Sequence, residues 1–203
     1  YRLERIEKIL GRKGMLLDIG CGPGNLLCLA KERGWEVIGV ETNKESARFA
    51  QVVNNVKVVV GGIEDYVEKW AGLFDAIHFN QVVEHLNDPV RFMNGVRRII
   101  KPEGVIFCGV PNEDSIINNL ANLYFKFKRS NFTPMLSPTF PPYHVIGFSP
   151  KTIRLLFQNT GFKVVNVEHV NYSNIDLKAF VEGRFLKGFK SIIGLSARVF
   201  AHG

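Results

Sequence analysis

The decisive stretch reads Leu16-Leu17-Asp18-Ile19-Gly20-Cys21-Gly22-Pro23-Gly24-Asn25. A short apolar run ends in an acid, and three glycines then alternate with small residues before a helical pattern resumes. This order predicts a strand, a tight turn and the start of a helix, because glycine tolerates positive φ and lets a ligand approach the backbone. A glycine turn alone is weak evidence of a site. It becomes informative when a strand–helix–strand unit surrounds it and an acid ends the next strand.

The segments around this turn supply that context. Apolar runs typical of strands alternate with helical patterns along the chain. The strands are expected at 15–19, 35–40, 56–60, 74–79, 105–110 and 162–170, and the helices at 1–10, 25–33, 43–53, 63–70, 88–100 and 149–160. The alternation predicts an α/β fold, a doubly wound and mostly parallel sheet with helices on both faces. Ligands of such sheets lie beyond the carboxyl ends of the strands, where the glycine turn lies.

The regular alternation ends after Pro111. Residues 112–146 form a long segment with many aromatic residues followed by several prolines. A connection of this length is usually functional or disordered, and the aromatics favour an ordered lid. We therefore expect one domain over 1–203, with a core at 11–111 and 147–170, a lid insertion at 112–146 and a basic tail at 171–203.

Charge is unevenly distributed over the 203 residues. Residues 1–119 carry 15 Lys+Arg against 16 Asp+Glu, whereas residues 120–203 carry 11 against 3. The excess of positive charge in residues 120–203 is compatible with binding to an acidic substrate, an anionic membrane or nucleic acid. It is equally explained as a basic surface that faces solvent. No charged-then-apolar leader and no run near the roughly 18 apolar residues of a membrane span are visible. The three cysteines are an odd number and are not spaced like metal ligands, which is typical of a reducing compartment. Together these features predict a cytoplasmic protein.

Three classes of ligand commonly use a glycine turn between a strand and a helix. A phosphate-binding P-loop is excluded, because Asn25 follows Gly24 where that motif needs Lys and then Ser or Thr. A dinucleotide site prefers the spacing G-x-G-x-x-G, whereas this chain has G-x-G-x-G. Asp18, two residues before the first glycine, is a poor neighbour for a pyrophosphate and a good one for a cation. S-adenosylmethionine carries an ammonium and a sulfonium and no phosphate, so the residues favour it.

Two further segments complete a nucleoside pocket. Glu41 ends the second strand, where a carboxylate accepts hydrogen bonds from both ribose hydroxyls, as it also does for NAD. Gly62-Ile63-Glu64 follows the third strand and suits an adenine, with a glycine for access, an apolar contact and an acid near the exocyclic amine. Glu64 is equally explained as an acid in the first turn of a helix, where the helix dipole favours it.

The chain resembles the class I S-adenosylmethionine-dependent methyltransferases, and most of all the small-molecule branch that includes the ubiquinone-biosynthesis O-methyltransferases. The matching segments are LLDIGCGPGNLL (16–27), GVE (39–41), GGIEDY (61–66), FDAIHFNQVVEHLNDP (74–89), IIKPEGVIFCGVPN (99–112) and FSPKTIRLLFQNTGF (148–162). The resemblance implies cofactor contacts at Gly20, Gly22, Glu41, Ile63 and Asn80, and more loosely at Arg2 of the leading helix. With their neighbours, the predicted site for S-adenosyl-L-methionine comprises Asp18, Gly20, Cys21, Gly22, Gly24, Glu41, Thr42, Gly62, Ile63, Glu64, Asn80 and Gln81.

The chain departs from this family in two places. The family's sheet ends with an antiparallel pair of strands, and only the first member, 162–170, is evident. Either 196–201 supplies the last strand or the chain stops short of it. The ubiquinone branch links an E-x-x-E-H motif after the fourth strand with a divalent metal, and here Gln81 replaces the first carboxylate while Glu84 and His85 remain. We therefore assign no metal ligand.

Methyl transfer is an in-line displacement, so positioning supplies much of the rate, and a base is needed only if the acceptor loses a proton. His85 is the best-placed base, although His85 and Glu84 also make sense as residues that fix the turn. Tyr143 and His144 end the lid and either close over the acceptor or form a surface turn. Phe140-Pro141-Pro142-Tyr143 is similar to the N-P-P-Y signature of amino-methylating enzymes, but that signature belongs directly after the fourth strand.

We expect a methyltransferase that acts on a small-molecule or lipid-like acceptor, with transfer to oxygen favoured and an apolar acceptor compatible with the aromatic lid. The aromatic lid and the basic C-terminal part are consistent with peripheral contact with an anionic membrane. Methylation of RNA or protein is the alternative enzyme, although a nucleic-acid partner is not expected. A module that binds S-adenosylmethionine without catalysis is the alternative of another class.

Overall fold

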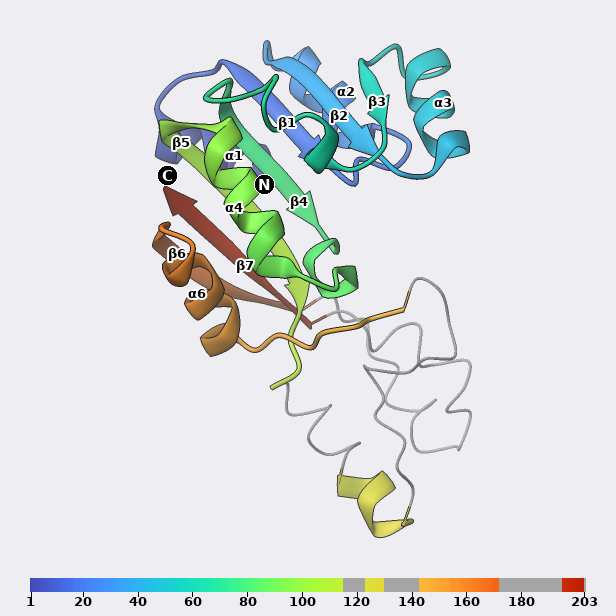
Figure 1. Ribbon diagram of the computed structural model, residues 1–203, viewed down its shortest axis with the longest axis vertical. Coiled ribbons are helices and arrows are strands. Elements are labelled where there is room, and N and C mark those ends of the chain that lie inside the picture. The colour runs from blue at the N-terminus through green and yellow to red at the C-terminus, as the bar shows by residue number, and fades with distance from the viewer. Residues whose placement is uncertain (115–122, 130–142, 172–194, 203) are drawn as a thin grey trace.

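The computed structural model describes residues 1–114, 123–129, 143–171 and 195–202 (Figure 1). One seven-stranded sheet runs through them in the order β3-β2-β1-β4-β5-β7-β6. Its strands are β1 Met15–Ile19, β2 Glu36–Glu41, β3 Val58–Val60, β4 Phe74–Asn80, β5 Ile100–Pro111, β6 Lys163–Asn171 and β7 Leu195–His202. The helices are α1 Arg2–Leu10, α2 Asn25–Glu32, α3 Lys44–Val52, α4 Pro89–Ile99 and α6 Pro150–Asn159, with 3₁₀ turns η1 Ile63–Asp65 and η2 Val83–His85. The predicted α/β fold is confirmed.

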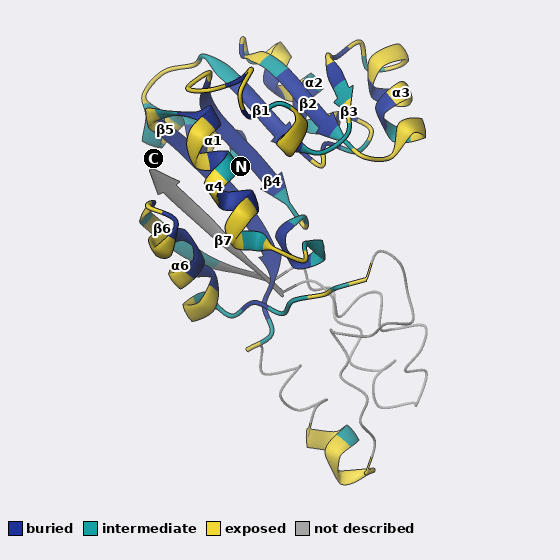
Figure 2. Ribbon diagram, in the orientation of Figure 1, coloured by how far each residue is buried: buried dark blue, intermediate teal, exposed yellow. Residues whose placement is uncertain are grey.

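The sheet has a hydrophobic core on each face, as expected of a doubly wound fold. Leu17 and Ile19 of β1 point into the core formed with α4 and α6, which lie in front of the sheet in Figure 1. Leu16, their neighbour in sequence, belongs to the opposite core with α1, α2 and α3. The alternation follows from the two-residue period of a strand. Figure 2 accordingly shows the central strands β1, β4 and β5 almost entirely buried.

Local signals in the sequence set where several helices begin. Asn43 caps α3, since its side chain accepts hydrogen bonds from the backbone amides of Glu45 and Ser46. Ser149 and Thr152 form a reciprocal capping box at the start of α6, with Pro150 at the first helical position. These caps fix the residues at which α3 and α6 begin.

The C-terminal strand resolves the open question about the end of the sheet. β7 lies between β5 and β6 and is antiparallel to both. The predicted core boundaries therefore need correction at both ends of the chain. Residues 195–202 of the expected basic tail belong to the sheet, and α1 packs its buried Leu3 and Ile6 against the core.

Two elements differ from their predicted form. β5 begins at Ile100, five residues before the strand expected at 105–110, because Ile100 already pairs with Phe74, and the register shifts before Val105 pairs with Ala76. The helix expected over 63–70 is a 3₁₀ turn at 63–65 followed by further turns. Within these turns the Trp70 amide donates to the Tyr66 carbonyl at 2.9 Å, and the two rings stack at 4.5 Å between centroids.

Most of the predicted lid and tail, at 115–122, 130–142 and 172–194, lies outside the described residues. The part of the lid that the structure describes includes a short helix at 123–127. Within the described ranges, no helix is both long enough and apolar enough to cross a bilayer.

Candidate functional site

The glycine turn has the conformation that its sequence predicts. Gly20, Gly22 and Gly24 all have positive φ, at 70°, 54° and 83°. The Gly20 amide donates to the carbonyl of Val40 at 2.8 Å, which fastens the turn to β2. A Cβ on Gly22 would meet no atom within 4 Å, so this residue faces open space. The turn therefore leaves room for a ligand at Gly22.

Gly24 has a different role from the one predicted. A Cβ at this position would lie 3.0 Å from the Cβ of Ala50 in α3 and 2.9 Å from Cγ2 of Val56. Gly24 is thus the close-packing point between the turn and α3. The geometry gives it a structural function and offers no surface of it to a cofactor.

Glu41 joins the end of β2 to the glycine turn. Its Oε2 accepts a hydrogen bond from the Gly22 amide at 2.8 Å, and its Oε1 accepts one from the Asn43 amide at 2.8 Å. The Thr42 hydroxyl lies 3.4 Å from the same Oε1. A carboxylate has about four acceptor positions, so positions remain for hydroxyl donors of a ligand. This arrangement is consistent with the predicted ribose role, and Thr42 takes part through Glu41.

Asp18 is buried and bonded within the sheet, and its predicted place beside a cofactor cation stays a prediction. Its side chain is 5% exposed, and Oδ1 lies 2.6 Å from Nδ1 of His78 on the adjacent strand β4. Nη1 of Arg2 lies 3.5 Å from Nε2 of the same ring. Because a guanidinium only donates, Nε2 accepts from Arg2, and the Nδ1–H group donates a hydrogen bond to Oδ1 of Asp18. Asp18 thus joins β1 to β4 within the sheet.

Cys21 is also turned inward. Its side chain is buried, and a Cβ on Gly39 would lie 2.6 Å from its Sγ. Burial, aided by the charges of Asp18 and Glu41, raises the pKa of the Cys21 thiol to about 12. The thiol is therefore neutral, and its packing explains why β2 carries a glycine at position 39.

The segment Gly62-Ile63-Glu64 is only partly available to a ligand. The Ile63 side chain is 1% exposed and its Cδ1 lies toward Gly95 of α4, so the predicted apolar contact with adenine is not supported by the geometry. Glu64 is exposed and its carboxylate folds back over Gly62, where a Cβ would collide with it. The glycine is therefore needed for the position of Glu64.

Asn80 and Gln81 end β4 at the same edge of the sheet. The Asn80 side chain lies against Gly109, where a Cβ would collide with it. Gln81 has a positive φ of 57°, and its amide donates to the Gly109 carbonyl at 2.7 Å. Left-handed backbone at a non-glycine residue is often found at functional sites. The strained corner directs the chain from β4 into η2.

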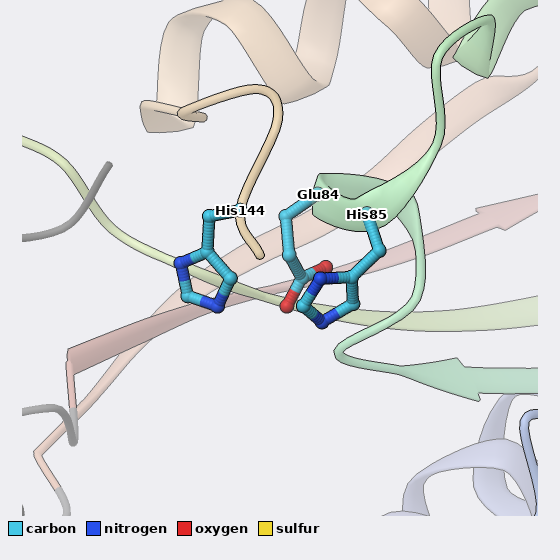
Figure 3. A group of neighbouring side chains, drawn as sticks. All are labelled: Glu84, His85 and His144. Atoms are coloured by element: carbon cyan, nitrogen blue, oxygen red, sulfur yellow. The ribbon is translucent and has the colours of Figure 1, made fainter. Parts of the chain in front are cut away.

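The η2 turn carries a buried carboxylate beside two imidazoles. Glu84 is 1% exposed, and neither of its carboxylate oxygens has a hydrogen-bond partner among the described residues. Burial raises the Glu84 pKa to about 7. The rings of His85 and His144 lie 5.0 Å apart between centroids. Figure 3 shows the Glu84 carboxylate directed into the space between the two rings.

Backbone hydrogen bonds hold the end of the predicted lid against this turn. The amides of Val145 and Ile146 donate to the Glu84 carbonyl at 2.8 and 3.1 Å. Nδ1 of His85 lies 2.8 Å from the carbonyl oxygen of Tyr143. Since a carbonyl only accepts, Nδ1 carries a proton, and in the neutral ring Nε2 therefore has the lone pair. The structure thus brings the predicted residues His85 and His144 together.

Tyr143 contributes less than predicted. Its side chain is exposed, and only its carbonyl oxygen takes part in the cluster. The segment that leads from β4 into the cluster contacts the glycine turn, since a Cβ on Gly20 would lie 2.7 Å from Cγ2 of Val82, two residues before Glu84. Glu84 was not predicted as a member of the site, although the Glu-His pair of the family motif pointed to it. It also missed His78, because no motif marks a polar residue inside a strand.

Comparison with known proteins assigns the chain to a family. The model of the family described as "Methyltransferase domain" matches residues 2–167. The human mitochondrial ubiquinone biosynthesis O-methyltransferase is 27% identical over 175 residues, covering 82% of this chain and 46% of that protein. The Vibrio campbellii ubiquinone biosynthesis O-methyltransferase is 28% identical over 119 residues, covering 56% of this chain and 50% of that protein. The chain thus spans about half the length of these relatives.

A solved structure supports the same fold. The crystal structure of an S-adenosylmethionine-dependent methyltransferase from Archaeoglobus fulgidus superposes with a TM-score of 0.68 at 23% identity, covering all of this chain and 91% of that one. The family model and the fold agree with the glycine turn, the acid at the end of β2 and the strand order. The chain therefore belongs to the methyltransferase-domain family, as a class I domain whose cofactor is S-adenosylmethionine.

Proposed function

We propose that this protein transfers a methyl group from S-adenosylmethionine to the oxygen of a small-molecule or lipid-like acceptor. The observation that carries the proposal is the Glu84–His85–His144 cluster beside the glycine turn. A cofactor whose ribose lies on Glu41 places its methionine part across the turn, toward η2. The relatives named as ubiquinone biosynthesis O-methyltransferases support an oxygen acceptor.

The chemistry requires one proton acceptor. The acceptor oxygen attacks the sulfonium methyl, the carbon–oxygen bond forms as the carbon–sulfur bond breaks, and S-adenosylhomocysteine leaves. A neutral hydroxyl must lose its proton during this step. Nε2 of His85 can take it, because the hydrogen bond from Nδ1 to the Tyr143 carbonyl leaves the lone pair on Nε2.

An apolar acceptor is supported by the described part of the predicted lid. The short helix at 123–127 exposes Leu123, Tyr124 and Phe127, and Phe127 is 86% exposed. The exposed Lys126 and Lys128 interleave with these apolar residues. Apolar and basic side chains in one exposed segment favour contact with an anionic lipid surface. We infer that this segment meets the membrane from which a lipid-like acceptor is taken.

Transfer from labelled cofactor tests the proposed reaction. The protein is incubated with S-adenosylmethionine labelled in its methyl group and a cell extract, which is then separated into organic-soluble, RNA and protein fractions. We expect label in the organic-soluble fraction, as methyl ether. Label confined to RNA or protein would contradict the acceptor class, and no transfer to any fraction would favour a module that binds the cofactor without catalysis.

Vesicle co-sedimentation tests the lipid contact separately. We expect binding to vesicles with phosphatidylserine that weakens with salt, and at least a fivefold loss for Phe127→Ser. Phe49→Ser is the matched control, because Phe49 is an exposed aromatic on α3, which lies at the other end of the molecule from the 123–127 helix in Figure 1. Equal binding by both variants would exclude the 123–127 helix as the contact.

A further inference from the structure

We propose that Glu84, His85 and His144 bind a divalent transition-metal cation, with His144 supplying the ligand that Gln81 cannot. One donor atom from each of the three residues can be chosen so that all lie within 4.8 Å of one another. The inference deepens the proposed function and rests on it for a role in catalysis: a bound cation, in place of a free Nε2 of His85, would assist the loss of the acceptor proton. Metal binding itself can be measured without an acceptor.

The buried carboxylate is the first reason for a cation. Glu84 is 1% exposed, and both of its oxygens are without a partner in the part of the chain that the structure describes. A buried carboxylate with no hydrogen bond is costly unless it is protonated or coordinates a metal. Its direction into the space between two imidazoles, seen in Figure 3, makes a shared cation a natural partner.

The hydrogen bonding of His85 is the second reason. A histidine that binds a metal through one nitrogen usually donates the other N–H to a carboxylate or backbone carbonyl, which fixes the ring. Nδ1 of His85 does this toward the Tyr143 carbonyl at 2.8 Å. Nε2 is therefore the nitrogen with the lone pair, and the ring is held in place before any ligand arrives.

Hydrogen bonds to the backbone of the two residues that flank His144 hold it beside η2. Tyr143 accepts the hydrogen bond from His85, while Val145 donates to the Glu84 carbonyl at 2.8 Å. The residue between them is therefore anchored beside η2 although it lies about sixty positions later in the chain. Gln81, the position of the missing carboxylate, is exposed and turned by its positive φ of 57°.

The donor set selects the kind of cation. Two imidazoles and one carboxylate suit Zn²⁺ and similar first-row ions, whereas Mg²⁺ prefers oxygen ligands. Two ligands of one zinc ion stand roughly 3.4 Å apart, so the three side chains need only a small closing rotation. When bound, such a cation lowers the pKa of an oxygen ligand, and Nε2 of His85 is then a metal ligand instead of a base.

Metal titration of the whole chain tests the proposal. The protein is stripped with a chelator, desalted, and titrated with Zn²⁺ or Mg²⁺ in a calorimeter and with Co²⁺ by visible absorption. We expect one Zn²⁺ or Co²⁺ per chain, an intense visible Co²⁺ band, and at least 100-fold weaker binding of Mg²⁺. Binding of Mg²⁺ alone, or of no cation, would overturn the proposal.

Variants assign the ligands. We expect His144→Asn and Glu84→Gln each to weaken Zn²⁺ binding at least tenfold. His202→Asn is the control, because this substitution also removes one imidazole. The backbone of His202 pairs with Val105, in the half of β5 that is remote from Pro111. Unchanged affinity in His144→Asn would overturn the role of His144. Retained affinity for S-adenosylmethionine shows that each variant is folded.

Hydrogen exchange gives a readout independent of affinity. Because the Val145 and Ile146 amides bond to Glu84, Zn²⁺ should slow their exchange in the wild type and not in His144→Asn. Equal exchange with and without Zn²⁺ would contradict the proposal. Methyl transfer without any metal binding would overturn the metal site alone, whereas metal binding without transfer to the organic fraction would overturn the proposed reaction alone.

Discussion

The carboxylate of Glu41 accepts a hydrogen bond from the backbone amide of Gly22 at 2.8 Å, across the gap between the end of β2 and the glycine turn. This bond shapes the turn at the residue that faces open space. Because a hydrogen bond to a charged group contributes about 1.5–3 kcal/mol, losing the Glu41 carboxylate affects both the turn and a bound ribose.

Replacing Glu41 with Ala should therefore weaken S-adenosylmethionine binding by roughly tenfold to a hundredfold, as measured by calorimetry. Glu36→Ala is the matched control, because Glu36 is an exposed acid at the opposite end of the same strand. A Glu41→Ala protein that binds the cofactor as tightly as Glu36→Ala would rule out the ribose role.

The turn glycines should respond differently to alanine. Gly22→Ala places a Cβ in open space and should lower cofactor affinity at least tenfold with a small loss of stability, about 1–2 kcal/mol for the left-handed backbone. Gly11→Ala is the control for that strain, since Gly11 also has positive φ, at 71°, and open space. It should lose similar stability and no affinity.

Gly24→Ala should instead destabilise the fold. Its Cβ would press on Ala50 and Val56, and overpacking of this kind typically costs about 1–3 kcal/mol in addition to backbone strain. Thermal unfolding would show a larger decrease for Gly24→Ala than for Gly22→Ala. The reverse order would show that the two glycines have been assigned the wrong roles.

The Glu7 carboxylate should make stability depend on acid pH. It accepts hydrogen bonds from Nε of Arg33 at 3.0 Å and from Nε1 of Trp35 at 3.0 Å, and the bonds from Arg33 contribute most to lowering its pKa from 4.5 to about 2. A lowered folded-state pKa stabilises the protein above pH 4.5, and this contribution is lost as pH falls from 4.5 toward 2. Since the side chains of Glu7 and Arg33 are both partly exposed, we expect a contribution of about 1 kcal/mol.

Urea unfolding at a series of pH values measures this contribution. The difference in unfolding free energy between wild type and Glu7→Gln should be present at neutral pH and shrink between pH 4.5 and 2. Glu4→Gln, an exposed acid on the same helix, is the control. A difference that stays constant across this range would show that the effect of Glu7→Gln is not electrostatic.

The three free cysteines should differ in reactivity. Burial raises the pKa of Cys21 to about 12 and that of Cys108 well above its usual value, whereas Cys28 is partly exposed. Because the thiolate is the reactive form, iodoacetamide at pH 8 should label Cys28 first. Mass spectrometry of the native protein that finds Cys21 or Cys108 labelled as fast as Cys28 would contradict the buried placement of these thiols.

Much of the fold could be predicted because its signals are local. Apolar strands that alternate with helices, the caps at Asn43 and Ser149, and the glycine turn each act within a few residues. The last strand was harder to predict, because β7 follows a long interval and pairs antiparallel with β5 and β6. Its place in the sheet depends on contacts between distant segments, which no local pattern encodes.

The site was predictable in type and less so in orientation. Sequence spacing put Asp18 and Ile63 at the sheet edge, but it does not say which way a side chain points. Asp18 turns inward because His78 offers a partner on the adjacent strand, and Ile63 because α4 covers it. His85 and His144 were predicted separately, and their contact depends on hydrogen bonds between segments far apart in the chain.

The most direct test is a crystal structure of the protein with S-adenosylhomocysteine. We predict that the ribose hydroxyls lie on the Glu41 carboxylate and that the sulfur faces the space bounded by Glu84, His85 and His144. A sulfur atom directed away from that cluster, with the three side chains beyond reach of a transferred methyl group, would contradict the account.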